Sequence, residues 1–252
     1  MAIVEWQKDG TVAIMTMNNG ENRHNPDWAE AMMETHAEIM ADPDVKAMVL
    51  TSSDPKNFCL GVDIEWMMKA QSENDFPGIS KWLYRQGDVF RALMMAPVPT
   101  IAAITGHAFG NGAMLAGACD FRFMRADRGY FCFPEVDLGI QFAPSMIEWM
   151  KRIMPYSFFL RMKFSGEKVG AAELEKHDVI IKACETREKT IEEAVAFGRT
   201  FNKSRLNIGE MKNRTYKHII DKMENEDPFY YDYNPEQVKE GKPPIFMFSP
   251  SR

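Results

Sequence analysis

The segment that most constrains the fold is an apolar strand that leads through a glycine-rich turn into a helix of small residues. Residues 100–104 read as a buried strand, and residues 113–118 read as the helix. Gly106, Gly110 and Gly112 stand between them. Glycines at such a turn leave backbone N–H groups unpaired at the positive end of a helix. Those groups can bind a phosphate or a developing oxyanion.

The spacing of these glycines argues against the two best-known nucleotide-binding turns. No Lys-Ser or Lys-Thr pair follows them, as the loop that binds nucleoside triphosphates requires. They also do not follow the spacing of the dinucleotide fingerprint. His107, inside the turn, could be catalytic, but a lone histidine beside a glycine turn is more often structural.

Strand–strand–helix units fill the first half of the chain, and helices fill the second half. The Asp9-Gly10 pair between apolar runs predicts a hairpin within residues 3–17. Asn25 and Pro26 have the N-cap and first-turn chemistry of a helix. Further strands are predicted at 47–51 and 120–124, and further helices at 79–95, 143–153, 157–163, 171–176, 187–202 and 207–224. This order predicts an α/β fold with a layered core followed by a helical subdomain.

Composition excludes several classes of protein. The 252 residues carry 36 acidic and 30 basic side chains, for a net charge of -6, and 45% of them are hydrophobic. A chain of this kind can bury a sizeable core and is not disordered as a whole. Its mild acidity argues against a nucleic-acid partner bound through bulk charge.

Localisation signals are not evident. No apolar run reaches the roughly 18 residues of a membrane span, and no secretory signal is recognisable. The final residues 250–252 do not match the Ser-Lys-Leu peroxisomal signal. The four cysteines lack metal or redox spacing, so we expect free thiols, no metal site and a cytoplasmic protein.

Two more segments carry candidate chemistry. In residues 58–63, Gly61 permits a tight turn with an exposed N–H group, although a plain turn with Asp63 capping a helix is the simpler interpretation. In residues 133–139, apolar neighbours surround Glu135, and desolvation would raise its pKa towards that of a useful base. An exposed strand end with ordinary charges is the alternative for that segment.

Together, segments 58–63, 99–120 and 133–139 resemble the crotonase superfamily, also called the enoyl-CoA hydratase/isomerase family. The resemblance extends over roughly residues 3–225. It implies a crotonase-like fold of repeated ββα units over residues 1–200, with a C-terminal helical trimerisation region and tail over 201–252. It also implies an acyl-CoA substrate, no cofactor beyond the coenzyme A of the thioester, and a homotrimer or homohexamer.

The resemblance assigns the two N–H donors of an oxyanion hole to Leu60 and Asn111. It places further residues around the substrate, namely Gly61, Val62, Asp63, Gly110 and Met114. Arg23 and Lys56 lie near the segments that contact coenzyme A in the family, although both could be solvated surface charges. Trp66, Met67, Met68, Phe142 and Trp149 could line the acyl tunnel or belong to the core. The aromatic segment 229–233 could contact a neighbouring subunit.

The carboxylates decide which reaction the resemblance implies. Hydratases of the family use two glutamates, and the first position is Met114 here, which cannot act as an acid or base. The second is Glu135, and Ala143 stands where dienoyl-CoA isomerases carry an aspartate. One remaining carboxylate is the pattern of Δ3,Δ2-enoyl-CoA isomerases, in which Glu135 would move a proton from C2 to C4. A hydratase with Asp137 as second acid, a hydrolase or lyase acting on an unusual acyl-CoA, and a non-catalytic acyl-CoA-binding member stay open.

Overall fold

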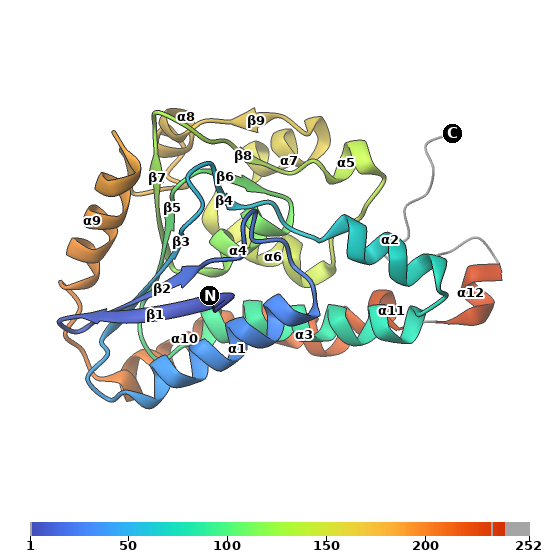
Figure 1. Cartoon of the computed structure of the whole chain (residues 1–252), viewed down its shortest axis with the longest axis horizontal. Coiled ribbons are helices and arrows are strands. Elements are labelled where there is room, and N and C mark those ends of the chain that lie inside the picture. Colours follow the sequence, from blue (N-terminus) through green and yellow to red (C-terminus); the bar gives the residue numbers. More distant parts are fainter. Residues whose placement is uncertain (1, 233, 240–252) are drawn as a thin grey trace.

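Two sheets organise the molecule, whose computed structural model describes residues 2–232 and 234–239 (Figure 1). The larger sheet has the strand order β1 (Val4–Asp9), β2 (Val12–Met17), β3 (Ala47–Ser52), β5 (Thr100–Ile104), β7 (Phe121–Arg125) and β10 (Lys182–Cys184). The smaller sheet has the order β4 (Asn57–Cys59), β6 (His107–Phe109), β8 (Phe131–Cys132) and β9 (Lys168–Val169). Apart from the β1–β2 hairpin and the β8–β9 pair, neighbouring strands are parallel.

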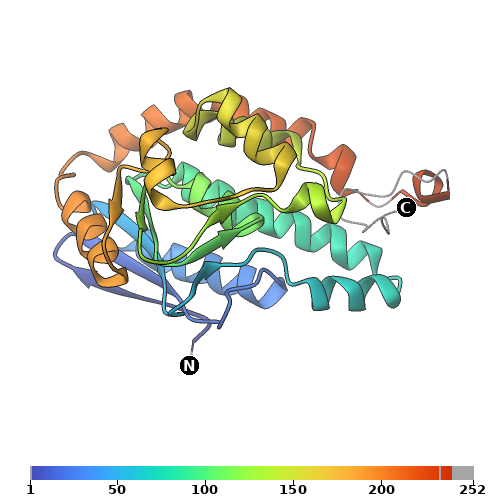
Figure 2. The ribbon, with the colours of Figure 1, turned by 90° about the horizontal axis from the view of Figure 1, so that it is seen from above.

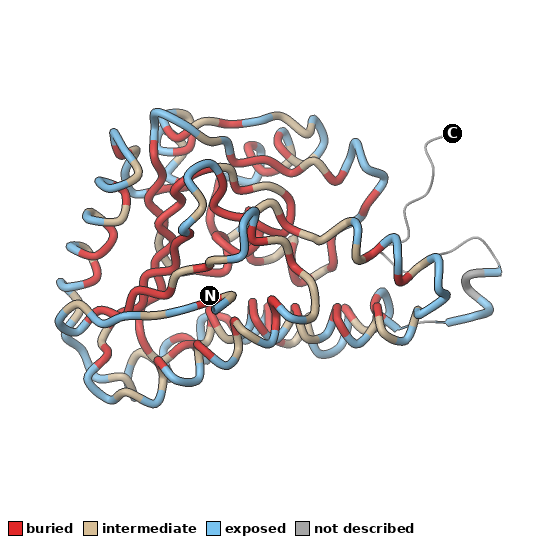
Figure 3. The backbone as a smooth tube through the Cα atoms, viewed as in Figure 1, coloured by how far each residue is buried: buried red, intermediate tan, exposed pale blue. Residues whose placement is uncertain are grey.

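The central strands of the larger sheet are buried on both faces (Figure 3). In β3, Met48 and Leu50 belong to the main hydrophobic core, whereas Ala47 and Val49 pack with a second cluster that includes Val195. Successive strand residues point to opposite faces, so an uninterrupted apolar run suits a sheet covered on both sides. Helix α9 (Arg187–Gly198) covers the second face.

Long helices form a layer beneath the sheets. Helices α1 (Pro26–Ala41), α3 (Phe76–Met95) and α10 (Arg205–Asn225) run along the long axis, and α3 packs against both others (Figures 1 and 2). The remaining helices are α2 (Ile64–Ser72), α4 (Asn111–Ala118), α5 (Glu135–Leu138), α6 (Pro144–Ile153), α7 (Tyr156–Ser165), α8 (Ala171–Lys176), α11 (Pro228–Tyr231) and α12 (Pro235–Lys239). The α/β core with a helical C-terminal region is as predicted.

Several local predictions are confirmed, and one open alternative is excluded. The hairpin forms, and the Asn25 side chain caps α1 by accepting a hydrogen bond from Trp28 N–H at 3.0 Å. Residues 133–139 contain the short helix α5 and not a strand end, because Gly139, at φ 68°, closes a helical turn begun at Glu135.

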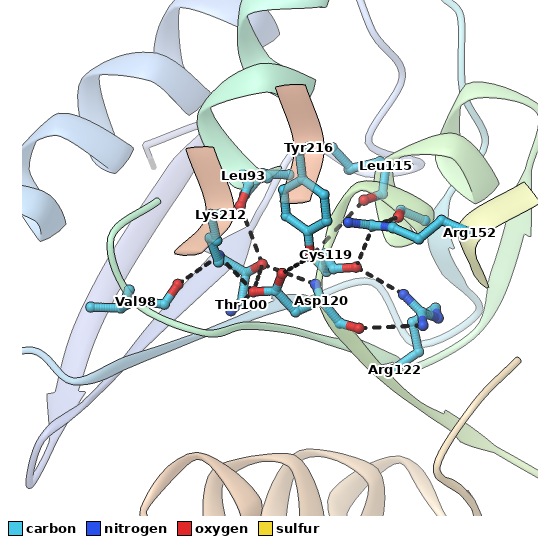
Figure 4. A network of polar contacts seen from close by, with 11 residues as sticks. Leu93, Val98, Thr100, Leu115, Cys119, Asp120, Arg122, Arg152, Lys212 and Tyr216 are labelled. Carbon is cyan, nitrogen blue, oxygen red and sulfur yellow. Dashed lines mark hydrogen bonds and ion pairs between the residues drawn. The ribbon is translucent and has the colours of Figure 1, made fainter. Parts of the chain in front are cut away.

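A buried polar cluster joins α10 to the larger sheet (Figure 4). Lys212 Nζ lies 2.6 Å from Asp120 Oδ2, and the Tyr216 hydroxyl donates to Asp120 Oδ1 at 2.8 Å. Thr100 N–H donates to the same carboxylate at 2.8 Å. These bonds satisfy Asp120 from two elements, so Asp120 is structural.

Two arginines extend this cluster to the C-terminal end of α4. Arg122 Nη1 donates to Cys119 O at 2.8 Å, and Arg152 Nη2 donates to Gly117 O at 2.6 Å and to Cys119 O at 3.1 Å (Figure 4). Cationic side chains stabilise the negative end of a helix and satisfy its last carbonyl groups. The C-terminal end of α4 is therefore held firmly in place.

The start of α6 depends on a residue near the end of the described chain. The N-cap residue Ala143 has no side chain that can accept a hydrogen bond. Instead, the buried Asp227 carboxylate accepts bonds from Ser145 N–H at 3.0 Å and from the Ser145 hydroxyl. Asp227 thus caps α6 across the tertiary structure.

In the described part of the chain, none of the helices is long and apolar enough to cross a membrane. Among the same residues, no group of three or more histidine, cysteine or acidic side chains is placed to hold a metal ion. The four cysteines are free and buried, as expected. Of the aromatic segment, Tyr231 is buried and Phe229 is 66% exposed, while residue 233 lies outside the described residues.

Candidate active site

Three segments singled out in the sequence meet at one end of the smaller sheet. Strands β4, β6 and β8 are neighbouring parallel strands. Their carboxyl ends lead to Leu60, Gly110 and Glu135, respectively. Parallel strands bring their carboxyl ends to the same edge of a sheet, which is the usual place for a binding site in an α/β protein.

Glycine allows two of these segments to touch. Gly61 has φ 76°, and a Cβ atom there would lie 2.8 Å from Phe109 O and 2.9 Å from Asn111 N. A Cβ atom on Gly112 would collide with the carbonyl group of Cys59. Side chains at these positions would push the loop after β4 away from the start of α4.

The structure corrects the register of one predicted oxyanion donor. Leu60 N–H already donates to Glu21 O at 3.0 Å and is not free to bind a ligand. Val62 N–H, two residues later, and Asn111 N–H have no acceptor among residues 2–232 and 234–239. Both residues line the same cavity, so the pair of free backbone donors is Val62 and Asn111.

Glu135 is the charged group at the site. It is 8% exposed, and its Oε2 atom is buried without a partner among the described residues. A Cβ atom on Gly110 would lie 3.0 Å from Glu135 Oε1, so the carboxylate lies directly against the glycine turn. Burial raises the pKa of Glu135 to about 7, as expected for a carboxylate without a neighbouring cation.

A mostly apolar cavity connects these groups, and the empty space within it and in the solvent at its mouth is about 540 Å³. Its lining comprises Leu60, Val62, Ile64, Met67, Gly110, Asn111, Pro134, Glu135, Leu138, Ile140, Gln141, Phe142 and Met146. Glu135 is the one carboxylate in this lining, whose other walls suit an apolar chain. Of the residues that the sequence suggested for the acyl tunnel, Met67 and Phe142 line the cavity. Trp149 lies in the core, and Met68 is 59% exposed.

Five predicted site residues, Arg23 among them, lie outside that lining. Met114 is fully buried in the core. Asp63 is the N-cap of α2, where it accepts from Trp66 N–H at 3.1 Å, in line with the simpler interpretation of that residue. Gly61 is buried in the contact with Asn111. Lys56 is exposed just before β4, at the opposite end of that strand from the cavity.

Arg23 lies close to the cavity. Its Nη1 atom donates to Val62 O at 3.4 Å, and its Nε atom pairs with Glu21 Oε2 at 2.8 Å. The side chain is 35% exposed, so its guanidinium group can be reached by an anion at the mouth. Asp137 is exposed, and His107 lies at the end of β6 that is remote from the cavity.

Sequence reasoning missed a buried polar chain behind the site. Gln86 Nε2 donates to His24 Nδ1 at 2.6 Å, and Asn111 Nδ2 donates to Gln86 Oε1 at 2.9 Å. His24 Nε2 lies 3.0 Å from Cys59 Sγ. Burial lowers the pKa of His24 to about 3, so the ring is neutral. No local pattern could reveal these contacts, because 62 positions separate His24 from Gln86.

Known proteins are similar to this chain in sequence. Over 139 residues the chain is 32% identical to the peroxisomal enoyl-CoA delta isomerase 2 of Arabidopsis thaliana, a match that covers 53% of this chain and 57% of that protein. Over 184 residues it is 30% identical to the short-chain-enoyl-CoA hydratase of Clostridium acetobutylicum, with 72% and 69% covered. The chain thus matches just over half the length of the plant isomerase.

Solved structures agree on the fold. An enoyl-CoA hydratase/isomerase family protein from Pseudomonas syringae superposes with a TM-score of 0.82 at 21% identity, covering 91% of this chain and 96% of that one. The sequence model for the family described as "Enoyl-CoA hydratase/isomerase" matches residues 7–235. With the strands, glycine turn and cavity described above, the chain therefore belongs to the enoyl-CoA hydratase/isomerase family.

Proposed function

We propose that the protein is a Δ3,Δ2-enoyl-CoA isomerase in which Glu135 carries out both proton transfers. The observation that carries this proposal is the single desolvated carboxylate in an apolar cavity beside two unpaired backbone N–H groups. A pKa of about 7 suits a group that must accept a proton and then return it. Relatives named as isomerase and as hydratase both match the chain, so the residues of the site have to discriminate between the two reactions.

The proposed reaction moves one proton and one double bond. Glu135 takes the proton from C2 of a 3-enoyl thioester, and the electron pair of that C–H bond moves into the C1–C2 bond, leaving negative charge on the thioester oxygen. Val62 and Asn111 N–H stabilise this dienolate, each donor contributing about 3–4 kcal/mol to the barrier reduction. Neutral Glu135 then protonates C4 while the double bond forms between C2 and C3, which restores the carboxylate.

Hydration would need different surroundings. An enzyme that adds water across a double bond must hold that water and supply a proton as well as a base. Met114 is an apolar and fully buried side chain where the hydratases of the family have their first glutamate. Asp137, the other candidate acid, is exposed and lies outside the cavity lining. These features favour proton transfer over hydration, which is the alternative function.

The coenzyme A part of the substrate would lie at the mouth of the cavity. Arg23, next to Val62, is the better placed of the two predicted cations, and Lys56 could act at a greater distance. No cofactor beyond coenzyme A enters the proposed reaction. A cytoplasmic homotrimer or homohexamer completes the proposal.

Two assays test the proposed reaction against hydration. We expect the wild-type protein to isomerise trans-3-hexenoyl-CoA without hydrating crotonyl-CoA at a comparable rate, and Glu135→Gln to abolish the isomerisation. Asp137→Asn is the matched control, because it neutralises a nearby carboxylate that lies outside the cavity lining, and it should retain the wild-type rate. Hydration at a comparable rate, or loss of activity in Asp137→Asn, would contradict the one-base mechanism.

A further inference from the structure

The backbone of His24 holds one half of the proposed oxyanion hole. His24 N–H donates to Gly61 O at 2.7 Å, and Asp63 N–H donates to His24 O at 2.9 Å. This parallel bridge pairs His24 with Val62. In such a bridge the N–H of the central residue points away from the partner strand, so the bridge fixes the direction of Val62 N–H.

The side chain of His24 reaches the other half. Its Nδ1 atom accepts a hydrogen bond from Gln86 Nε2, and Gln86 Oε1 accepts one from Asn111 Nδ2. Gln86 is 1% exposed and Asn111 is 4% exposed. A buried chain of two hydrogen bonds therefore joins His24 to the residue that supplies the second donor.

The donors and acceptors along this series of hydrogen bonds are consistent with one tautomer of His24. Because Gln86 donates to Nδ1, the proton of the neutral ring is on Nε2, which donates to Cys59 Sγ at 3.0 Å. The Cys59 thiol in turn donates to Asn22 O at 3.0 Å. The ring also stacks on Trp28, with 3.6 Å between ring centroids. Every polar atom of the imidazole is paired, and its orientation is fixed.

We propose that His24 and Gln86 are positioning residues that set the separation between Val62 N–H and Asn111 N–H. This inference rests on the proposed function, since it concerns how the two donors meet one thioester oxygen. A donor stabilises an oxyanion well when it lies about 2.7–3.1 Å from the charged oxygen, so a small displacement of either loop weakens the pair. The hydrogen bonds of His24 restrain both loops, because its backbone pairs with Val62 and its buried ring connects through Gln86 to Asn111.

Two substitutions break the chain at different links. Gln86→Met keeps the length of the side chain but removes both hydrogen bonds, and His24→Phe keeps the ring on Trp28 but removes Nδ1. We expect each to lower kcat for 3-hexenoyl-CoA about 10- to 100-fold, with KM within about threefold of wild type. The apparent pKa of the pH–rate profile, which reports Glu135, should not move. Leu174→Ala, in the core at α8, is the stability-matched control and should keep kcat.

A spectroscopic readout separates positioning from general loosening. The probe is hexanoyl-CoA carrying ¹³C at the thioester carbonyl, which lacks the double bond and cannot be isomerised. Wild type and Leu174→Ala should move the carbonyl resonance downfield on binding, and Gln86→Met and His24→Phe should reduce that shift. If wild type polarises the carbonyl and the two variants polarise it equally with unchanged kcat, the inference is overturned. If wild type neither binds nor polarises the probe, the proposed function fails with it.

A third variant decides the case in which the others do not fold. Asn111→Ala keeps the backbone donor but removes the side chain through which the chain acts. We expect it to reproduce the loss in kcat and in carbonyl shift. Where Gln86→Met folds, combining it with Asn111→Ala should add little to the loss of either, because both interrupt one link. An Asn111→Ala protein with wild-type kcat, or fully additive losses, would overturn the inference.

Discussion

The two ends of α4 differ in whether their backbone polar groups are paired. At the C-terminal end, Arg122 and Arg152 bind the carbonyl groups of residues 117 and 119 (Figure 4). At the N-terminal end, Asn111 N–H has no partner among the described residues, and no side chain caps the helix. An unpaired buried donor costs stability, so its presence at one end marks where a ligand is expected to complete the bonding.

The carboxylates near the two ends, Asp120 and Glu135, also differ in whether they are paired. Asp120 has Lys212 at 2.6 Å and three further donors from Thr100 and Tyr216. Glu135 lies in an apolar wall, and its Oε2 atom has no partner in the described structure. A paired carboxylate stabilises the fold, whereas an unpaired one is available for chemistry. The comparison teaches that this short helix has an anchored end and an end with unpaired polar groups, which is the reactive end under the proposed function.

The largest expected effect tests the reactive end. Glu135→Gln should lower kcat for isomerisation by about 10⁴-fold, because in the proposed mechanism one carboxylate performs both proton transfers. Its melting temperature should equal or exceed that of wild type, since the amide removes a desolvated charge. Steady-state kinetics and a thermal melt measure both quantities. A large loss of stability in this variant would mean that Glu135 belongs to the structural carboxylates.

The next effect tests the anchored end. Lys212→Met should lower the free energy of unfolding by about 3–5 kcal/mol, because it leaves the buried Asp120 carboxylate without its cation. The kcat per folded molecule should stay within about twofold of wild type. Urea denaturation measures the first quantity, and active-site-normalised kinetics measure the second. A selective loss of kcat would show that the two ends of α4 are not separate in function.

Both activity and stability should depend on pH through the raised pKa of Glu135. The pKa of Glu135 is raised to about 7 from an ordinary 4.5, so kcat/KM should rise with pH and level off above about 7. The folded state favours the protonated form, so the contribution of Glu135 to stability is fully present below pH 4.5. It is lost as the pH rises through 7, by roughly 3 kcal/mol in total. When the free energy of unfolding is plotted against pH, wild type should lose stability between pH 4.5 and 7 relative to Glu135→Gln. Parallel plots for the two proteins would contradict this prediction.

The smallest effects concern the mouth of the cavity. Arg23→Ala should raise KM for an acyl-CoA about three- to fivefold with little change in kcat, and Lys56→Ala should raise it about twofold. Exposed charges each contribute at most about 1 kcal/mol, and added salt should reduce both differences. Kinetics at two salt concentrations measure this. An equal effect of the two substitutions would contradict the closer placement of Arg23.

Features that depend on neighbouring residues could be predicted from the sequence. The hairpin at Asp9-Gly10, the Asn25 cap, the glycine turn and the desolvation of Glu135 all follow from local chemistry. The register of the donor after β4 could not be predicted, because it depends on Glu21 O, a carbonyl from a distant loop that pairs with Leu60. The proposed roles of His24 and Gln86 could not be predicted from the sequence either, because they depend on contacts between distant positions.

The cap that Asp227 places on α6 has a consequence for how the protein is made. Helix α6 carries Met146 in the cavity wall and follows directly on Phe142, yet the carboxylate that caps it comes more than eighty positions later in the chain. During synthesis, residues 142–146 leave the ribosome long before residue 227 does. The N-terminal end of α6 can therefore be capped by Asp227 only after almost all of the chain has been translated.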